Sequence, residues 1–124
     1  MIVRRTATGD PIAERLRGIC LALPEASEVE TRRGPSYRVA EKIFANDRRL
    51  DGRPSVWAKA PPGSQAVLIG ADPRRFFSPP YYGAKGWVGI WLDGAPDWRE
   101  VEAFVKRSYR LVAPKRLATS PSVQ

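Results

Sequence analysis

Turn-forming residues divide the middle of this chain into short segments. The spacing of these residues limits the fold more than any other feature of the sequence. Between residues 26 and 60, β-like runs alternate with stretches rich in Gly, Pro, Asn and Asp, the residues that tight turns require. The runs cover residues 28–31, 37–45 and 55–60. Short strands separated by turns are typical of an antiparallel sheet, so we predict a meander of neighbouring strands.

Helical patterns lie on both sides of this region. Asp10 can cap a helix with Pro11 in its first position, and apolar residues then recur on one face as far as residue 23. Nearer the C-terminus, Asp97 and Glu100 have the spacing of a capping box, and the segment that follows has an apolar face that includes Leu111. The sequence therefore predicts an α+β fold in which an antiparallel sheet packs against N- and C-terminal helices.

The segment between the meander and the last helix is less regular. Residues 64–72 predict a short helix that Ser64 can cap. Residues 87–92 are apolar and of strand length, so they predict a strand covered on parts of both faces. The aromatic and Pro-rich residues 76–83 between them predict an ordered loop that lies on the core.

The patterns divide the chain into one domain and two short ends. A length of 124 residues fits a single domain, and the periodic segments place that domain at residues 10–117. Residues 1–9 show little periodicity, so we predict a short N-terminal arm. Pro, Ser and Thr gather in residues 118–124, for which we predict a disordered tail.

Cys20 is the single cysteine of the chain, so an intramolecular disulfide cannot form. No apolar run of signal-peptide length follows Met1, and the longest apolar stretches are much shorter than the ~20 residues that span a bilayer. We therefore expect a cytoplasmic protein without membrane contacts, and we expect it to be monomeric.

The charge of the chain is strongly basic. Its 21 Lys and Arg residues outnumber its 13 Asp and Glu residues, which gives a formal net charge of +8. Such a surface attracts polyanions, of which nucleic acid is the leading candidate. A basic surface that only keeps the protein in solution is the alternative.

Enzyme chemistry has little support in the sequence. The chain has no histidine, which excludes Ser–His and Cys–His nucleophilic systems and, with a single cysteine, a zinc site of the usual ligands. The phosphate-loop and dinucleotide-binding glycine patterns are also missing. Cys20 lies on the apolar stripe of the first helix, as an inert packing residue does. We expect no catalytic residues, no metal site and no cofactor.

Four blocks of the sequence occur in an order that is known from one protein family. They are Leu-Pro-Glu-Ala at 23–26, Tyr-Arg-Val-Ala-Glu-Lys-Ile-Phe-Ala at 37–45, Tyr81 with Lys-Gly-Trp-Val at 85–88, and Ser-Tyr-Arg-Leu-Val at 108–112. In these blocks the chain resembles the MmcQ/YjbR family of small bacterial proteins, and the resemblance covers about residues 10–117. It implies a CyaY-like α+β fold and DNA binding of a double-wing type, and it carries no catalytic residues.

Two of the turns between predicted strands are basic. Arg32 and Arg33 are expected at the tip of one hairpin, and Arg48, Arg49 and Arg53 at the tip of another, where long cationic side chains can reach phosphates. We therefore predict that two basic wings bind DNA. Lysines in or beside the strands would extend the same surface: Lys42, Lys59 and Lys85. The alternative is that exposed turns are charged for solubility alone.

A second hypothesis concerns the aromatic loop at residues 77–87. Most aromatic residues of the chain are expected in the core, but Tyr81 and Tyr82 lie in a Pro-rich loop near Lys85 and Trp87. These four residues can flank a site for a small molecule or a protein partner. Binding to nucleic acid weakens steeply with salt, whereas binding in an aromatic pocket does not, so salt separates the two hypotheses.

Overall fold

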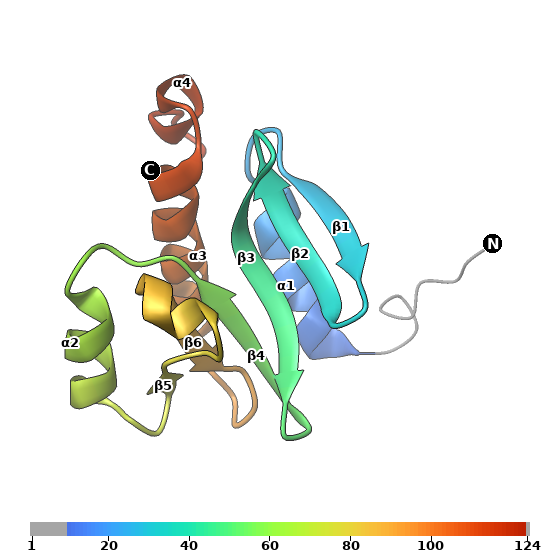
Figure 1. Cartoon of the computed structure of the whole chain (residues 1–124). Helices are drawn as coiled ribbons and strands as arrows, with labels where there is room; N and C mark the ends of the chain where they lie inside the picture. The colour runs from blue at the N-terminus through green and yellow to red at the C-terminus, as the bar shows by residue number, and fades with distance from the viewer. Residues whose placement is uncertain (1–9, 124) are drawn as a thin grey trace.

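Six antiparallel strands form one sheet in the order β1-β2-β3-β4-β6-β5 (Figure 1). The computed structural model describes residues 10–123. The strands are β1 (Ser27–Thr31), β2 (Gly34–Val39), β3 (Lys42–Leu50), β4 (Arg53–Ala58), β5 (Phe76–Phe77) and β6 (Val88–Trp91). The predicted α+β class and the antiparallel meander of the first four strands are confirmed.

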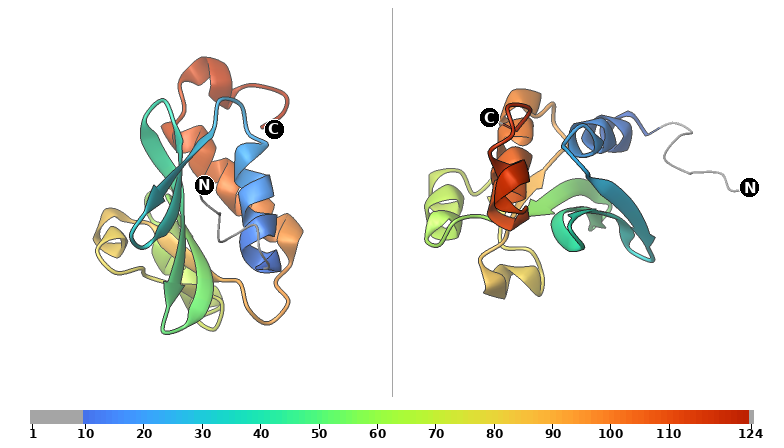
Figure 2. Two further views of the ribbon diagram at one scale, coloured as in Figure 1. Left: turned by 90° about the vertical axis from the view of Figure 1, so that its right-hand side faces the viewer. Right: turned by 90° about the horizontal axis from the view of Figure 1, so that it is seen from above.

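Within the described residues, four helices and one 3-10 helix surround this sheet. They are α1 (Pro11–Leu21), α2 (Ser64–Ala71), the 3-10 helix η2 (Tyr82–Lys85), α3 (Trp98–Val112) and α4 (Lys115–Ala118). The right-hand view of Figure 2 shows α1 and α3 on one side of the sheet and η2 on the other, with α2 beside the β5 edge. We call the side that faces away from α1 and α3 the open face.

The two long helices begin where their sequence patterns predict. Asp10 accepts a hydrogen bond from the backbone N–H of Ala13 at 3.1 Å, and Pro11 opens α1. Asp97 caps α3 by accepting from the N–H of Arg99. The short helix α2 also lies where predicted, but its N-cap is Gly63, and Ser64 makes no cap.

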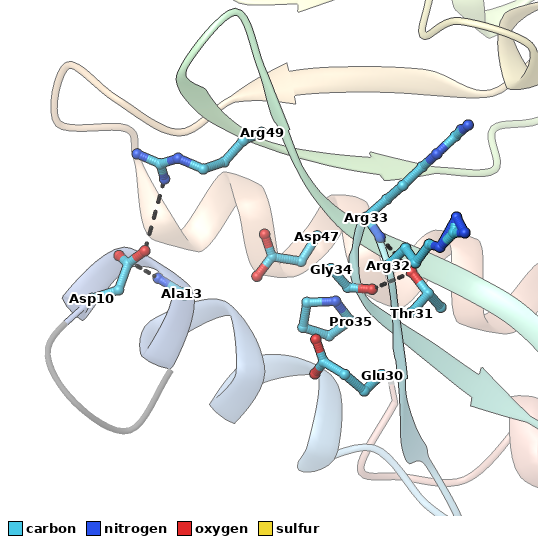
Figure 3. Close-up of a pocket in the computed structure, with 10 residues that line it drawn as sticks. All are labelled: Asp10, Ala13, Glu30, Thr31, Arg32, Arg33, Gly34, Pro35, Asp47 and Arg49. Atoms are coloured by element: carbon cyan, nitrogen blue, oxygen red, sulfur yellow. Dashed lines mark hydrogen bonds and ion pairs between the residues drawn. The ribbon is translucent and has the colours of Figure 1, made fainter. Parts of the chain in front are cut away.

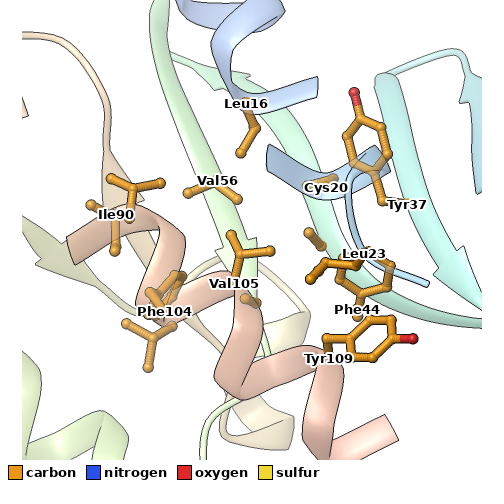
Figure 4. Packing of buried hydrophobic residues seen from close by; sticks show 14 of the residues in the cluster. Leu16, Cys20, Leu23, Tyr37, Phe44, Val56, Ile90, Phe104, Val105 and Tyr109 are labelled. Atoms are coloured by element: carbon orange, nitrogen blue, oxygen red, sulfur yellow. The ribbon is translucent and has the colours of Figure 1, made fainter. Parts of the chain in front are cut away.

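The core lies between the sheet and the two long helices (Figure 4). Leu16 and Cys20 of α1 and Val105 of α3 are fully buried there. Tyr109 is fully buried as well, and its ring meets that of Phe44 edge-on at 5.3 Å between centroids. The predicted apolar face of α3 is wrong at one position, because Leu111 is 42% exposed.

The strand boundaries correct two predictions. The run 37–45 is not one strand: Ala40 and Glu41 turn the chain with positive φ angles of 51° and 65°, and β3 starts after them. The long turn predicted at 46–54 contracts to Asp51 and Gly52, both with positive φ, as in the two-residue hairpins that Asp-Gly favours. Residues 46–50 therefore belong to β3.

The predicted disorder of residues 118–124 is wrong for the described part, 118–123. Val123 is fully buried, and its carbonyl accepts a hydrogen bond from Nη1 of Arg110 at 3.0 Å. The predicted arm at residues 1–9 lies outside the described residues, as does residue 124. Within 10–123, the structure contains no helix with the length and apolar character that crossing a membrane requires.

Candidate nucleic-acid interface

The β1–β2 turn and the β3–β4 turn lie at the same end of the sheet (Figure 1). Alternate connections of an antiparallel meander always fall at the same end. Arg32 and Arg33 are exposed in the first turn, as predicted, and neither forms a salt bridge with another residue of the described chain. This turn is the part of the predicted wings that the structure leaves available to a partner.

A hollow of about 520 Å³ separates this turn from the start of α1 (Figure 3). Its wall carries charges of both signs, with Nη1 of Arg49 lying 3.8 Å from Oδ2 of Asp10. The charged lining residues are Asp10, Glu30, Asp47, Arg32, Arg33 and Arg49. Three carboxylates balance three guanidinium groups, so the interior of the hollow does not favour an anion.

The prediction for Arg48 is wrong, because this side chain is buried within the sheet and does not project from a tip. The residue is only 8% exposed. Its Nη1 donates to the carbonyls of Pro35 and Asp47 at 3.0 and 2.9 Å, and its Nη2 to Ser36 Oγ and Asn46 Oδ1 at 3.1 and 3.2 Å. Burial lowers the pKa of Arg48. These bonds give Arg48 a structural role.

Arg53 is exposed but already engaged. Its Nε and Nη2 donate to the two carboxylate oxygens of Asp93 at 2.7 and 3.0 Å. The guanidinium group also lies over the ring of Trp91, 3.9 Å from the centroid. The second predicted wing is therefore the two-residue turn Asp51–Gly52, and Arg49 of β3 and Arg53 of β4 on either side of it each face a carboxylate.

Strand alternation sorts the charges of the sheet by side. Glu28 of β1 faces α1, where its Oε1 accepts from Nε of Arg17 at 2.9 Å. The other acidic strand residues, Glu30 and Asp47, line the hollow beside α1 and so share that side. Among the described strands β1 to β6, no acidic residue has its side chain on the open face.

Cations, in contrast, occupy the open face. Arg38 is paired in register with Ile43, two positions from Ser36, and is half-buried. Lys59 follows the end of β4 and is also half-buried, whereas Lys85 is exposed in η2. Lys42 starts β3 at the opposite end from the Arg32–Arg33 turn, so it lies apart from the wing arginines.

The loop around η2 packs against the open face. The Tyr82 ring lies 6.0 Å from the ring of Trp57 and 4.7 Å from that of Trp87, and both tryptophans are buried. Gln65 holds the loop by donating to the carbonyls of Gly83 and Trp87 at 2.9 and 2.7 Å. The aromatic rings thus fill most of the space that the second hypothesis assigned to a ligand.

Two members of that predicted site remain accessible. Tyr81 is 73% exposed, and Nζ of Lys85 lies 4.8 Å from its ring centroid. Trp91 offers no free ring face, since Phe77 stacks on it at 4.3 Å between centroids and Arg53 covers it as well.

Asn46 and Arg38 were missed by the sequence reasoning. Asn46 is fully buried, and its Oδ1 accepts from Ser36 and Arg48, while its Nδ2 has no hydrogen-bond partner within the described residues. The Nε of Arg38 is likewise buried without a partner there. The alternation of Ser36 and Arg38 with apolar neighbours is a signal that could have found Arg38, whereas residues 46–49 are all polar, so no alternation marks Asn46.

Comparison with known proteins gives a family and a fold. A family model described as YjbR matches residues 21–111. The crystal structure of Deinococcus radiodurans protein DR2400, with the family-model domain DUF419, is similar with a TM-score of 0.73 and 21% sequence identity, and the match covers 86% of this chain and 82% of that one. At this identity the likeness shows the fold alone. A comparison with curated proteins gives no significant match.

Proposed function

This chain belongs to the YjbR family, and we propose that it binds nucleic acid through phosphate contacts, by association and not by catalysis. The observation that carries the proposal is the separation of charge across the sheet. The acidic strand residues Glu28, Glu30 and Asp47 all face the helix side, and the open face presents cations without acidic strand neighbours.

Several cations on and beside this surface support the proposed phosphate contacts. Arg38, Lys59 and Lys85 belong to the open face, and Arg32 and Arg33 extend from the end of the same sheet. Each Lys or Arg that meets a phosphate releases condensed counterions, and this release supplies much of the binding free energy. Contacts of this kind position a protein on nucleic acid without reading its sequence.

Phosphate contacts fit the surface better than base stacking does. A stacking platform needs aromatic rings with free faces. Trp57 and Trp87 are buried, Trp91 is covered on both sides, and Tyr81 alone among the loop aromatics is largely exposed. We therefore propose duplex DNA as the partner, with affinity dominated by charge.

The side chain best suited to nucleophilic chemistry is held inert. Cys20 is fully buried, and burial raises the pKa of its thiol well above the ordinary value. A neutral thiol without solvent access is a poor nucleophile. This supports a binding role over a catalytic one.

The proposal is tested by fluorescence anisotropy with a labelled random-sequence duplex at salt concentrations between about 50 and 200 mM. The face variant carries Arg38→Gln, Lys59→Gln and Lys85→Gln. The control variant carries Arg99→Gln, Lys106→Gln and Lys115→Gln on α3 and α4, so it loses the same charge from the helix side.

We expect the wild-type protein to bind with a steep salt dependence. The face variant should bind at least tenfold more weakly, and its log–log salt slope should shrink by roughly 0.9 for each phosphate that it no longer neutralises. The control variant should bind nearly as the wild type does. Equal losses of affinity in both variants would mean that net charge alone, and not the open face, determines binding. An absence of wild-type binding at low salt would overturn the proposal. Salt-insensitive binding that Tyr81→Ala abolishes would favour the aromatic loop.

A further inference from the structure

An apolar groove is lined by residues of α2, α3, β5 and β6. Figure 1 shows α2 and α3 beside the edge of the sheet that β5 and β6 form. The volume of the groove is about 320 Å³. Leu68 of α2, Phe76 of β5, Ile90 of β6 and Phe104 of α3 supply its apolar wall. The groove is on the helix side of the sheet, so it is separate from the proposed nucleic-acid interface.

One end of the groove is positively charged. Arg107 and Arg110 both line it and are three positions apart on α3, which places them on the same face of the helix. The Nε of Arg107 is buried and has no hydrogen-bond partner among residues 10–123. Burial and the neighbouring charge of Arg110 lower the pKa of Arg107. Arg107 is thus a partly desolvated cation in need of an acceptor.

The carboxylate that also lines the groove does not meet this need. Glu100 is held by Arg75, whose Nη1 and Nη2 donate to its two carboxylate oxygens, the latter at 2.9 Å. Arg75 also donates to Asp72 at 2.8 Å, which anchors this arrangement at the end of α2. The charge of Glu100 is therefore compensated before any ligand arrives, and the positive end of the groove stays positive.

We propose that this groove binds a small molecule with an apolar chain and a terminal carboxylate, such as a medium-chain fatty acid. The carboxylate pairs with the guanidinium group of Arg107, since arginine offers paired donors that match carboxylate geometry. The chain lies on Leu68, Phe76 and Phe104, where it leaves water. The volume is at the lower end of the about 300 to 1,000 Å³ typical of ligand sites, which fits one short chain.

The helix α2 makes the groove adaptable on one side. None of its residues is fully buried, and Val67 is 69% exposed. A helix with so few buried side chains can shift by a small distance at low cost to admit a chain.

The test is an NMR titration of the ¹⁵N-labelled protein with sodium octanoate, kept below its micelle-forming concentration, and with 1-octanol as the uncharged probe. Arg107→Met removes the charge while preserving the volume of the side chain. Ala103→Phe fills the groove from α3. Arg99→Met is the matched control, since Arg99 is exposed elsewhere on α3. Circular dichroism melting of each variant verifies folding.

We expect octanoate to shift the amide signals of residues 103–107 and of α2. Arg107→Met should weaken octanoate binding at least tenfold without affecting octanol, Ala103→Phe should weaken both, and Arg99→Met neither. An absence of shifts in the wild-type protein overturns the proposal. Octanoate binding that survives Arg107→Met overturns the role of the carboxylate, and binding that survives Ala103→Phe overturns the location.

Discussion

Arg48 donates a hydrogen bond to the side-chain oxygen of Asn46, 3.2 Å from Nη2 to Oδ1, between two residues of one strand that are almost completely buried. Ser36 donates to the same oxygen at 2.6 Å. Since that oxygen receives two donors, a flipped Asn46 amide would place its N–H groups against them. The three side chains therefore have a single arrangement, which fixes the pairing of β2 with β3.

Replacing Arg48 with alanine should lower the free energy of unfolding by about 2–4 kcal/mol. The substitution removes the guanidinium donor from the carbonyls of Pro35 and Asp47 and one of the two donors from Asn46 Oδ1. Urea denaturation measures the loss. Arg49→Ala is the matched control, because Arg49 is exposed and makes one long ion pair, so its removal should cost less than about 0.5 kcal/mol. Equal losses at the two positions would contradict a structural role for Arg48.

Two glycines should respond to alanine with opposite signs. The Cβ of Gly89→Ala would overlap the ring of Phe77, which lies across this position and stacks on Trp91. We expect Gly89→Ala to lower the free energy of unfolding by about 1–3 kcal/mol. Its near-ultraviolet circular dichroism signal should also weaken as the ring is displaced. Gly18 lies in a helix, and a Cβ added there would meet no neighbouring atom within 4 Å. Gly18→Ala should therefore raise the free energy of unfolding by about 0.5–1 kcal/mol. Two changes of the same sign would refute this account.

Ser108 joins α3 to the sheet through a hydroxyl group that donates to the carbonyl of Phe44 at 2.7 Å and accepts from the N–H of Lys59 at 2.9 Å. Ser108→Ala leaves both backbone groups unpaired in a fully buried site, so it should cost about 1–3 kcal/mol in chemical denaturation. Ser122→Ala, at an exposed position, should change the stability by less than about 0.5 kcal/mol. A near-zero effect at Ser108 would show that water replaces the hydroxyl.

Stability should fall in alkaline solution. Burial raises the pKa of the Cys20 thiol and of the Tyr37 phenol in the folded state. The unfolded chain then releases protons at about pH 8.5 and pH 10 that the folded chain retains, so rising pH favours unfolding by up to about 1.4 kcal/mol per pH unit for each group.

Urea midpoints between pH 7.5 and 10.5 follow this loss. In Cys20→Ala the decline should begin nearer pH 10, because Tyr37 alone remains of the two groups. An identical pH profile for wild type and variant would exclude Cys20 as a contributor.

The helices could be predicted from sequence because their start signals are local. Asp10 with Pro11, and Asp97 with its apolar stripe, depend only on neighbours within one or two turns. The turn at Asp51–Gly52 could also be predicted from its Asp-Gly dipeptide. The strand before the turn could not, because its last residues are more polar than those of a typical strand. Because residues 46–49 are all polar, they show no period-two alternation that would have extended the strand through them.

The site could be predicted only in part, because strand register decides whether a charged side chain is exposed, buried or paired. Arg32 is exposed as expected, since it occupies a turn. Arg48 is buried because Ser36 of β2 lies opposite Asn46, and Arg53 is engaged because Asp93 follows β6, 40 residues away. Such partners come from other strands, and a linear pattern does not reveal them.

The connections within the sheet have a consequence for the order of folding. Strands β1 to β4 are joined by two-residue turns, whereas β6 reaches β4 only after residues 59–87 have carried the chain through α2, β5 and η2. Short loops close at a smaller entropic cost than long ones, so the four-stranded hairpin array is the natural nucleus. We expect residues 59–87 to dock after the transition state. Substitutions in the turns of β1 to β4 should then slow folding, while substitutions in residues 59–87 should mainly accelerate unfolding.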